Sequence, residues 1–399
     1  MNKQEDNVII VFEAACDAHW MKDVVQFPNA LANELFGKKA VLIARPNNCQ
    51  HILKEHIELC TLGKHNKAND ENFRKQLFSE IETSTEWYTQ AIMLAAKKGS
   101  VLIIYPFCGS PFSASRRFKL LRWLKFKKAR VVLKSDISEY FAAPGSLAFK
   151  AKYKATFKSM LRDVVNYFFI DRIICENGKI YKNLLRYQIH FRRKLVYVPN
   201  CPLDIYSKQN LPPYSKKSDT FLYVGRIDDV QKGIDILMDA WKNVFGKLPG
   251  WKLLISGAAS HEKRAYWEEI LKKTDVNNSI EWLGFLEPVE LLEQYDNSKI
   301  VVCSSRWESG PIVLSEAILS GCAFIGTAAG EIPAILKGLP GLVQDEQSLA
   351  ETMLHFARHP EIAGKQAEVL FERMKDRKWS EQVKKVFEKN KVKTYSNFG

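Results

Sequence analysis

The sequence predicts an α/β protein made of two doubly wound parallel sheets that follow one another along the chain. Three observations support this fold class. Short apolar runs alternate with helical stretches, the runs fall into two series, and a polar stretch with two adjacent prolines lies between the series. Parallel strands need helical crossovers and are buried on both faces, so they appear in a sequence as continuous apolar runs. A length of 399 residues is sufficient for two such domains.

The expected strands divide the chain into domains. The first series lies at residues 8–12, 40–44, 101–105, 130–133, 172–175 and 195–198, and the second at 220–224, 251–256, 280–283, 300–303, 323–325 and 341–343. The polar, proline-containing residues 199–218 between them are expected to be a hinge. We therefore predict a first domain over residues 1–200 and a second over 201–378. Residues 379–399 remain, and we expect an amphipathic helix over 379–391 that packs back onto the first domain.

The loop and helix after the fourth strand of the second series carry two glutamates, Glu308 and Glu316. Ser309 or Gly310 suits the helix cap and Pro311 suits the first helical position, so Glu308 is expected on the loop and Glu316 inside the helix. Free N–H groups at a helix start favour a phosphate, and acids on either side of it could hold sugar hydroxyls. This arrangement indicates a nucleotide-sugar site. An ordinary loop with two surface acids is the alternative.

A basic pair follows the first strand of the second series. Arg226 comes directly after Gly225, and Lys232 lies just before the next expected helix. Doubly wound sheets bind ligands at the carboxyl ends of their strands, so both cations are expected at the same sheet edge as Glu308. A guanidinium fork and an ammonium group together suit a diphosphate. Each cation alone could be a solvated side chain, and the combination with the glutamates favours the diphosphate.

The positive charge of the chain is concentrated in one quarter of it. The formal net charge is +14, and residues 101–200 hold 21 basic but only five acidic residues. Two segments there, 116–128 and 149–158, interleave lysine and arginine with aromatic residues, a pattern typical of contact with an anionic membrane surface. The alternative is a core-facing stripe with a solvated basic side. No nucleic-acid recognition motif accompanies the charge, so no nucleic-acid partner is expected.

The sequence contains no run of about 18 apolar residues and begins with a polar stretch, so neither a spanning helix nor a secretory signal is expected. Its eight cysteines are scattered without a C-x-x-C pair, which suits reduced thiols. We therefore expect a cytoplasmic protein, peripheral on the inner face of the plasma membrane if the basic segments bind lipid.

Four motifs occur in order in the second half: Tyr223-Val-Gly-Arg226 with Lys232-Gly233, then Trp282-Leu-Gly-Phe285, then Glu308-x7-Glu316, then Gly330-Glu-Ile-Pro333. Together they resemble the donor domain of retaining glycosyltransferases of the GT-B fold, family 4 (glycosyl transferases group 1). The resemblance implies two Rossmann-like domains facing a cleft, with the acceptor bound by the first and a nucleotide sugar by the second. The implied reaction is transfer of a sugar, with retention of configuration, to a glycan or lipid-linked glycan in cell-surface polysaccharide, lipopolysaccharide or glycolipid synthesis.

The resemblance also implies roles for individual residues. Arg226 and Lys232 would stabilise the departing nucleoside diphosphate, Glu308 would lie near the donor sugar as the third catalytic residue, and Glu316 would bind the ribose. Phe285 and Leu286 would present backbone to the nucleobase. The remaining donor contacts are expected at Gly225, Gly310, Pro311 and Ile312. No Asp-x-Asp occurs in the sequence, so neither a metal nor a cofactor is expected.

The first half departs from the family pattern. Many members carry a glycine-rich loop after the first strand, where this chain has Glu13-Ala-Ala-Cys-Asp-Ala-His19. Many also carry a histidine on a loop that faces the donor sugar, whereas the corresponding strand ends here are Tyr105-Pro-Phe-Cys-Gly109 and Leu133-Lys-Ser-Asp136. Our acceptor-side candidates are Asp17, His19, Lys134 and Asp136, and a capping or solvated role is the alternative for each. Two further hypotheses for the whole chain are an inactive glycosyltransferase-like subunit and a basic protein that binds membranes or nucleic acid.

Overall fold

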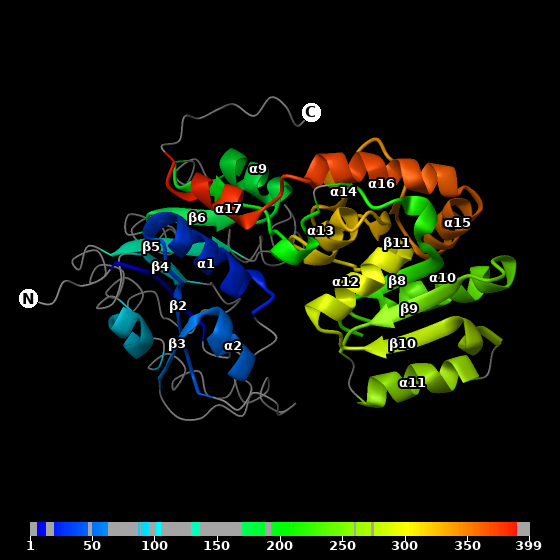
Figure 1. Cartoon of the computed structure of the whole chain (residues 1–399), viewed down its shortest axis with the longest axis horizontal. Helices are drawn as coiled ribbons and strands as arrows, with labels where there is room; N and C mark the ends of the chain where they lie inside the picture. Colours follow the sequence, from blue (N-terminus) through cyan, green and yellow to red (C-terminus); the bar gives the residue numbers. More distant parts are fainter. Residues whose placement is uncertain are drawn as a thin grey trace, which may run out of the picture. The chain divides into compact units, whose positions relative to one another are not determined.

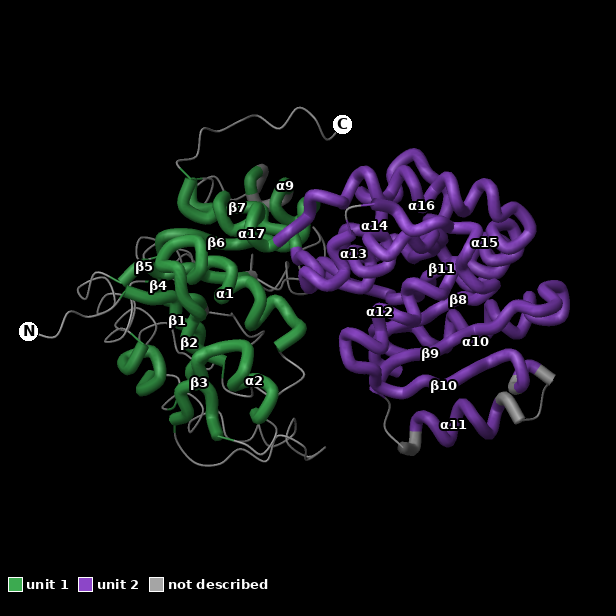
Figure 2. Tube along the Cα trace, viewed as in Figure 1, with its two compact units in different colours: residues 1–137, 141–199, 379–399 green, residues 138–140, 200–378 purple. Residues whose placement is uncertain are grey.

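The computed structural model forms two compact units (Figure 2). The first contains residues 1–137, 141–199 and 379–399, and the second contains mainly residues 200–378. The structure describes residues 6–12, 20–46, 50–62, 87, 89–95, 101–104, 129–135, 170–187, 193–208, 210–227, 229–258, 261–272 and 275–388. Because the chain leaves the first unit after residue 199 and returns to it at residue 379, the second unit is an insertion within the first.

A seven-stranded parallel sheet forms the centre of the first unit, in the order β3-β2-β1-β4-β5-β6-β7 (Figure 1). Its strands are β1 (Val8–Val11), β2 (Val41–Ala44), β3 (Glu58–Thr61), β4 (Val101–Ile104), β5 (Arg130–Ser135), β6 (Arg172–Cys175) and β7 (Leu195–Tyr197). The described helices of this unit include α1 (Asp23–Phe36), α2 (His51–His56), α9 (Gly178–Tyr187) and α17 (Trp379–Gln382).

The second unit contains a six-stranded parallel sheet in the order β10-β9-β8-β11-β12-β13. Its strands are β8 (Ser218–Val224), β9 (Lys252–Ser256), β10 (Ile280–Gly284), β11 (Ser298–Cys303), β12 (Ala323–Thr327) and β13 (Leu342–Val343). Its helices are α10 (Ile234–Val244), α11 (His261–Lys272), α12 (Pro288–Asn297), α13 (Ile312–Leu319), α14 (Ile332–Ile335), α15 (Glu346–Arg358) and α16 (Pro360–Met374).

The central strands of the second sheet are buried on both faces, whereas the edge strands β10 and β13 are partly exposed. Phe221, Leu222 and Tyr223 are consecutive on β8 and at most 2% exposed, although neighbouring side chains of a strand point to opposite faces. Trp241 of α10 lies edge-on against Phe221, with ring centroids 5.7 Å apart. Burial on both faces explains why these strands appear in the sequence as unbroken apolar runs.

Each sheet has a point where the direction of winding reverses. In the second sheet the chain runs outward from β8 through β9 to β10, and then resumes on the other side of β8 with β11. The carboxyl ends of β8 and β11 are therefore neighbours at the switch point, where doubly wound sheets bind ligands. The corresponding pair in the first sheet is β1 and β4.

The twelve expected strands are all present, with ends within two residues of the expected positions. Strand β3 was not predicted, because its residues are partly or fully exposed at the sheet edge and form no apolar run. The expected helix over 379–391 also differs. Within the described residues 379–388, only Trp379–Gln382 is α-helical, and Val383–Val386 continue as a 3-10 turn. Val383 and Val386 are buried nevertheless, and the Arg172 side chain donates to the carbonyl of Val386 at 2.7 Å.

Candidate functional site

The loop between β8 and α10 carries the two predicted cations. Arg226 is exposed, donates from Nη2 to Oε1 of Gln231 at 2.6 Å, and accepts a hydrogen bond on its carbonyl from the Tyr223 hydroxyl at 2.9 Å. The side chain of Lys232 is 21% exposed and lies one residue before Gly233, the cap of α10. The loop thus fixes both cations near the start of a helix.

Glu308 lies on the loop after β11, as predicted, and its carboxylate is held from two sides. Its Oε1 accepts from the Lys232 ammonium at 2.5 Å and from the Ser305 hydroxyl at 2.7 Å. The Glu308 side chain is only 9% exposed. Ser305 is fixed in turn because its carbonyl accepts from the Thr327 hydroxyl. A buried carboxylate with a cation and a hydroxyl as partners is a preorganised polar group.

Further contacts join the two loops. The Arg306 amide donates to the Gln231 carbonyl at 2.8 Å, and the Arg306 guanidinium binds both carboxylate oxygens of Asp235 at 2.6 and 2.8 Å. Gly233 has φ +61°, and a Cβ at this position would lie 2.2 Å from the Ser304 carbonyl oxygen. Only glycine permits both this conformation and this approach. The predicted residues Arg226, Lys232 and Glu308 are therefore carried by two loops that are bonded to each other at the switch point.

Glu316 lies on α13, as predicted, but the helix begins later than expected. Pro311 is the N-terminal cap residue and Ile312 is the first helical residue, because Pro311 has ψ 117° and is extended. The predicted cap at Ser309 or Gly310 is therefore wrong by one or two positions. Gly310 instead accepts a hydrogen bond on its carbonyl from the Asn200 side chain at 3.1 Å.

The environment of Glu316 alters its acidity. The Tyr295 hydroxyl donates to Glu316 Oε2 at 2.9 Å, and Tyr295 is fully buried. Burial raises the pKa of Glu316 to about 7, against the smaller opposing effect of the Tyr295 hydrogen bond. Burial and the Glu316 carboxylate raise the pKa of Tyr295 well above its ordinary value. Glu316 thus titrates in the physiological range.

Phe285 and Leu286 follow β10 and lie on the same sheet edge. Backbone hydrogen bonds connect the ends of the three strands: Gly225 donates to Ser256 at 3.0 Å, and Gly257 donates to Gly284 at 2.8 Å. Phe285 is 52% exposed and Leu286 is partly buried. The structure therefore aligns the predicted base-binding loop with the loop that carries Arg226, and the Gly225 and Gly257 backbones touch.

The acceptor-side candidates are placed differently. Lys134 is fully buried at the end of β5, where its ammonium pairs with Asp23 and Glu176. Burial by itself lowers the pKa of Lys134, but the two carboxylates raise it by more, so it lies above its ordinary value. The prediction that Lys134 faces an acceptor is wrong, because its ammonium group is paired with two carboxylates in the interior of the first unit. Asp17, His19 and Asp136 lie outside the described residues.

The basic segments 116–128 and 149–158 also lie outside the described residues. Where the structure describes the chain, no helix is both long and apolar enough to cross a membrane. Within the same ranges, no three His, Cys, Asp or Glu side chains gather closely enough to hold a metal ion. The membrane surface and the absence of a metal requirement both stay predictions.

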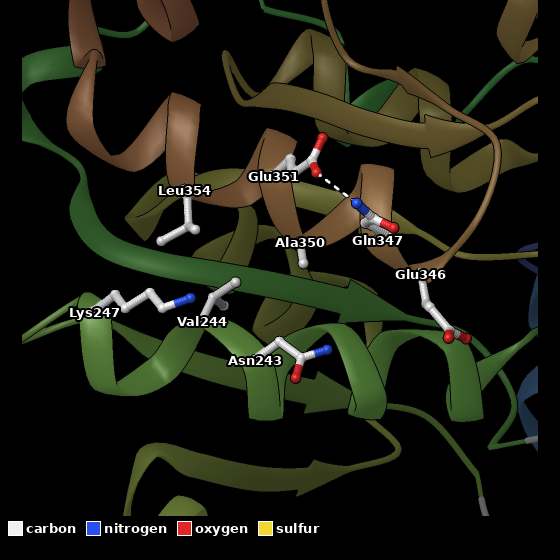
Figure 3. A pocket seen from close by; sticks show the side chains of 8 residues that line it. All are labelled: Asn243, Val244, Lys247, Glu346, Gln347, Ala350, Glu351 and Leu354. Atoms are coloured by element: carbon white, nitrogen blue, oxygen red, sulfur yellow. Dashed lines mark hydrogen bonds between the residues drawn. The ribbon is translucent and has the colours of Figure 1, made fainter.

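A separate hollow of about 380 Å³ lies between α10 and α15 (Figure 3). It is lined by Asn243, Val244, Lys247, Glu346, Gln347, Ala350, Glu351 and Leu354. Its α10 residues come from the C-terminal end of that helix, whereas Lys232 and Gly233 lie at the N-terminal end. A helix of this length extends about 16 Å, so the hollow is distinct from the candidate site.

Comparison with known proteins identifies the second unit. A family model described as glycosyl transferases group 1 matches residues 208–385. The amylovoran biosynthesis glycosyltransferase AmsD of Erwinia amylovora is 34% identical over 135 residues, which cover 34% of this chain and 36% of that protein. Residues 208–385, nearly all of which lie in the second unit, are thus similar to the glycosyl transferases group 1 family. The match to AmsD spans about a third of that relative's length.

Solved structures extend the likeness to the whole fold. Anabaena Alr3699/HepE, solved in complex with UDP and glucose, has a TM-score of 0.64 at 13% identity and covers 96% of this chain and 98% of its own. WaaG, a glycosyltransferase involved in lipopolysaccharide biosynthesis, has a TM-score of 0.58 at 14% identity and covers 95% and 98%. The two parallel-sheet units thus have the GT-B fold, as the resemblance implied.

The second unit also contains site residues that were not predicted from the sequence. Ser305, Gln231 and Tyr295 hold Glu308, Arg226 and Glu316, respectively. Gly257 was missed although it follows an expected strand and has φ +153°, with a Cβ position only 1.7 Å from the Gly225 carbonyl oxygen. A glycine directly after a strand is the signal that could have indicated this close approach.

Proposed function

We propose that this protein is a glycosyltransferase that uses a nucleoside-diphosphate-sugar donor and transfers the sugar with retention of configuration. The observation that carries the proposal is the bond between Lys232 and Glu308 across the switch point of a group 1 domain, with Arg226 on the same loop as Lys232. A fixed cation beside a fixed carboxylate suits a ligand that combines a diphosphate with a sugar. The UDP and glucose bound to Alr3699/HepE support this donor class.

The proposed reaction assigns a task to each charged residue. The bond between the anomeric carbon and the β-phosphate oxygen breaks, an acceptor hydroxyl oxygen bonds to that carbon, and the acceptor proton passes to the departing diphosphate. Arg226 and Lys232 stabilise the negative charge that develops on the diphosphate, without a metal. Glu308 lies by the sugar, and Glu316 binds the ribose hydroxyls. The acceptor is a glycan or lipid-linked glycan, a class supported by the lipopolysaccharide role of WaaG.

Ligand binding tests the donor class first. The full-length protein is melted with UDP, GDP, ADP and their sugar conjugates, and one nucleotide family should raise the melting temperature. A ligand present at 100 times its dissociation constant adds about 2.7 kcal/mol to the free energy of unfolding. No shift with any of them would contradict the proposal.

Turnover then tests the chemistry. Arg226→Ala and Lys232→Ala should each raise the barrier by about 2–4 kcal/mol, by analogy with the loss of one oxyanion contact. Release of nucleoside diphosphate from the identified donor is measured with and without a crude glycan acceptor. Lys242→Ala is the matched control, because Lys242 lies near the C-terminal end of α10, away from the candidate site, and pairs with Asp239 there. Near-normal rates in both site variants would refute the assignment, and a wild-type protein that binds donor without releasing product would be an inactive subunit.

A further inference from the structure

The strongest unassigned feature is a buried ion pair beside the loop that carries Glu308. The Arg377 guanidinium pairs with the Glu331 carboxylate, and the two side chains are 11% and 4% exposed. Glu331 belongs to the Gly330-Glu-Ile-Pro333 motif, which has no role in the proposed chemistry. A buried pair of this kind is costly to disrupt from one side, because the remaining charge stays in a poorly solvated place.

Arg377 also binds the other end of the unit. Its Nε donates to the carbonyl of Asn200 at 2.9 Å. Asn200 is the first residue of the continuous part of the second unit, and Arg377 is one residue before its last, Lys378. The Arg377 guanidinium therefore links the two ends of the segment 200–378, where the chain enters and leaves the second unit.

Both partners of Arg377 contact the candidate donor loop. The Asn200 side chain, in a residue only 6% exposed, donates to the Gly310 carbonyl at 3.1 Å. On the other side, Gly330 precedes Glu331 and has φ +59°, and a Cβ there would lie 2.6 Å from the Ser309 carbonyl oxygen and 2.9 Å from Glu308 Cβ. The backbone at Gly330 therefore lies directly against the residues next to Gly310.

These contacts close into a ring that runs from Arg377 through Glu331, Gly330, Ser309, Gly310 and Asn200 back to Arg377. The loop between β11 and α13 has no regular secondary structure from residue 304 to 311, so its conformation depends on such contacts. The ring supplies two of these contacts, that of Gly330 with Ser309 and that of Asn200 with Gly310.

We infer that Arg377, Asn200 and Glu331 are positioning residues for donor binding, which hold the segment from Glu308 to Ile312 in the conformation that meets the sugar and diphosphate. This inference rests on the proposed function for the identity of the ligand. The effect of these residues on the conformation of the loop does not depend on the ligand, so it can be measured in the ligand-free protein.

The experiment uses the full-length protein and four variants, to which the affinity measurement adds Arg377→Lys. Arg377→Gln removes the charge and the fork, Glu331→Gln keeps the shape but removes the charge, and Asn200→Asp replaces the donor to Gly310 with a carboxylate of the same size. Arg373→Gln is the matched control. Arg373 lies four residues before Arg377, in the last turn of α16. It donates to the carbonyls of Ile335 and Lys337, which are outside the ring.

Hydrogen exchange of the ligand-free proteins is the first measurement. Amides of residues 306–314 should exchange about fivefold faster in the three ring variants, because a buried partner of the loop is lost. Exchange in α15 should be unchanged in all variants, and the control should leave 306–314 as in the wild type. If Arg377→Gln does not fold, the isosteric Asn200→Asp tests the contact with Gly310 alone. Unchanged exchange in 306–314 overturns the inference.

Nucleotide affinity is the second measurement, made with whichever of UDP, GDP or ADP binds the wild type. The ring variants should bind it about tenfold more weakly, with Arg377→Lys recovering only part of the loss, because an ammonium group serves Glu331 but cannot reach two partners as a fork does. Wild-type affinity in the ring variants overturns the positioning role. A wild-type protein that binds none of the nucleotides refutes the proposed function, and the exchange rates of 306–314 then decide whether the ring holds the loop.

Discussion

Glu316 illustrates how the surroundings of one residue change its chemistry. The sequence predicts an acid inside a helix that could hold sugar hydroxyls, and α13 places its carboxylate against the buried Tyr295 hydroxyl. The pKa of about 7 means that the folded protein carries both the neutral and the charged form near neutrality. In its proposed role as a ribose ligand, Glu316 accepts hydrogen bonds from the ribose diol when it is charged, so we expect donor affinity to rise as Glu316 loses its proton.

The titration of Glu316 predicts a pH-dependent stability. In the unfolded chain its pKa is near the ordinary value of 4.5, so between about pH 4.5 and 7 folding takes up a proton. The stability that Glu316 contributes is therefore fully present below pH 4.5. It decreases as the pH rises, and it is lost once the pH passes about 7. Glu316→Gln should gain stability relative to the wild type from pH 5 to 8, measured by urea unfolding. A stability difference that is constant over this range would contradict the assignment.

Single residues also set the limits of sequence-based prediction. Arg226, Lys232, Glu308 and Glu316 could be selected because each follows a strand at a position that the fold class makes important. Their supporting residues could not, since Tyr295 and Ser305 have no distinctive local pattern and act through tertiary contacts. Lys134 shows the opposite error: a lysine at a strand end looks available, and only the fold reveals the two carboxylates that enclose it.

At the scale of elements, the predicted strands follow from burial. Unbroken apolar runs identify strands covered on both faces, such as β9, β11 and β12. The partly exposed edge strand β10 could still be predicted because it keeps Ile280, Trp282 and Leu283, whereas the edge strand β3 has no apolar run. The start of α13 was misplaced because Pro311 suits either the cap or the first helical position, and local sequence does not distinguish them. Loop geometry depends on contacts such as that of Gly233 with Ser304, which join different elements.

The junction between the β8 loop and α10 leads to a prediction about Gly233. Gly233→Ala should lower stability and also weaken nucleotide binding, because its Cβ would push the Ser304 carbonyl away and separate Lys232 from Glu308. Gly338→Ala is the control, since Gly338 has φ +75° but no atom within 4 Å of the added carbon. The control should lose only about 1–2 kcal/mol, the cost of a left-handed residue. Equal losses of stability and binding in both variants would show that the contact with Ser304 is unimportant.

For the whole molecule, the main structural fact is that residues from both ends of the chain build the first unit. Trp379 of α17 lies against Phe27 of α1, with ring centroids 5.9 Å apart, and is 4% exposed. The Phe387 ring lies 4.5 Å below the Arg130 guanidinium of β5. The sequence showed an apolar stripe in this segment, and the tertiary structure shows what covers it.

Replacement of Trp379 should therefore affect the first unit selectively. Trp379→Ala should cost about 3–5 kcal/mol, the usual loss for a buried aromatic residue. Trp379→Phe should cost much less, because the indole N–H has no hydrogen-bond partner within the described part of the chain. Calorimetry gives the stability, and the nucleotide dissociation constant, set by the second unit, should stay at its wild-type value in both variants. A large change in that constant would contradict the division of tasks between the units.

The discontinuous first unit has a consequence for biosynthesis. During translation, residues 1–199 leave the ribosome without α17, so the surface of α1 around Phe27 stays uncovered while all of the second unit is made. Nearly all residues of the second unit lie in one continuous segment, 200–378, so it can finish folding first. The core of the first unit can therefore be completed only after the residues from Trp379 onward have been synthesised.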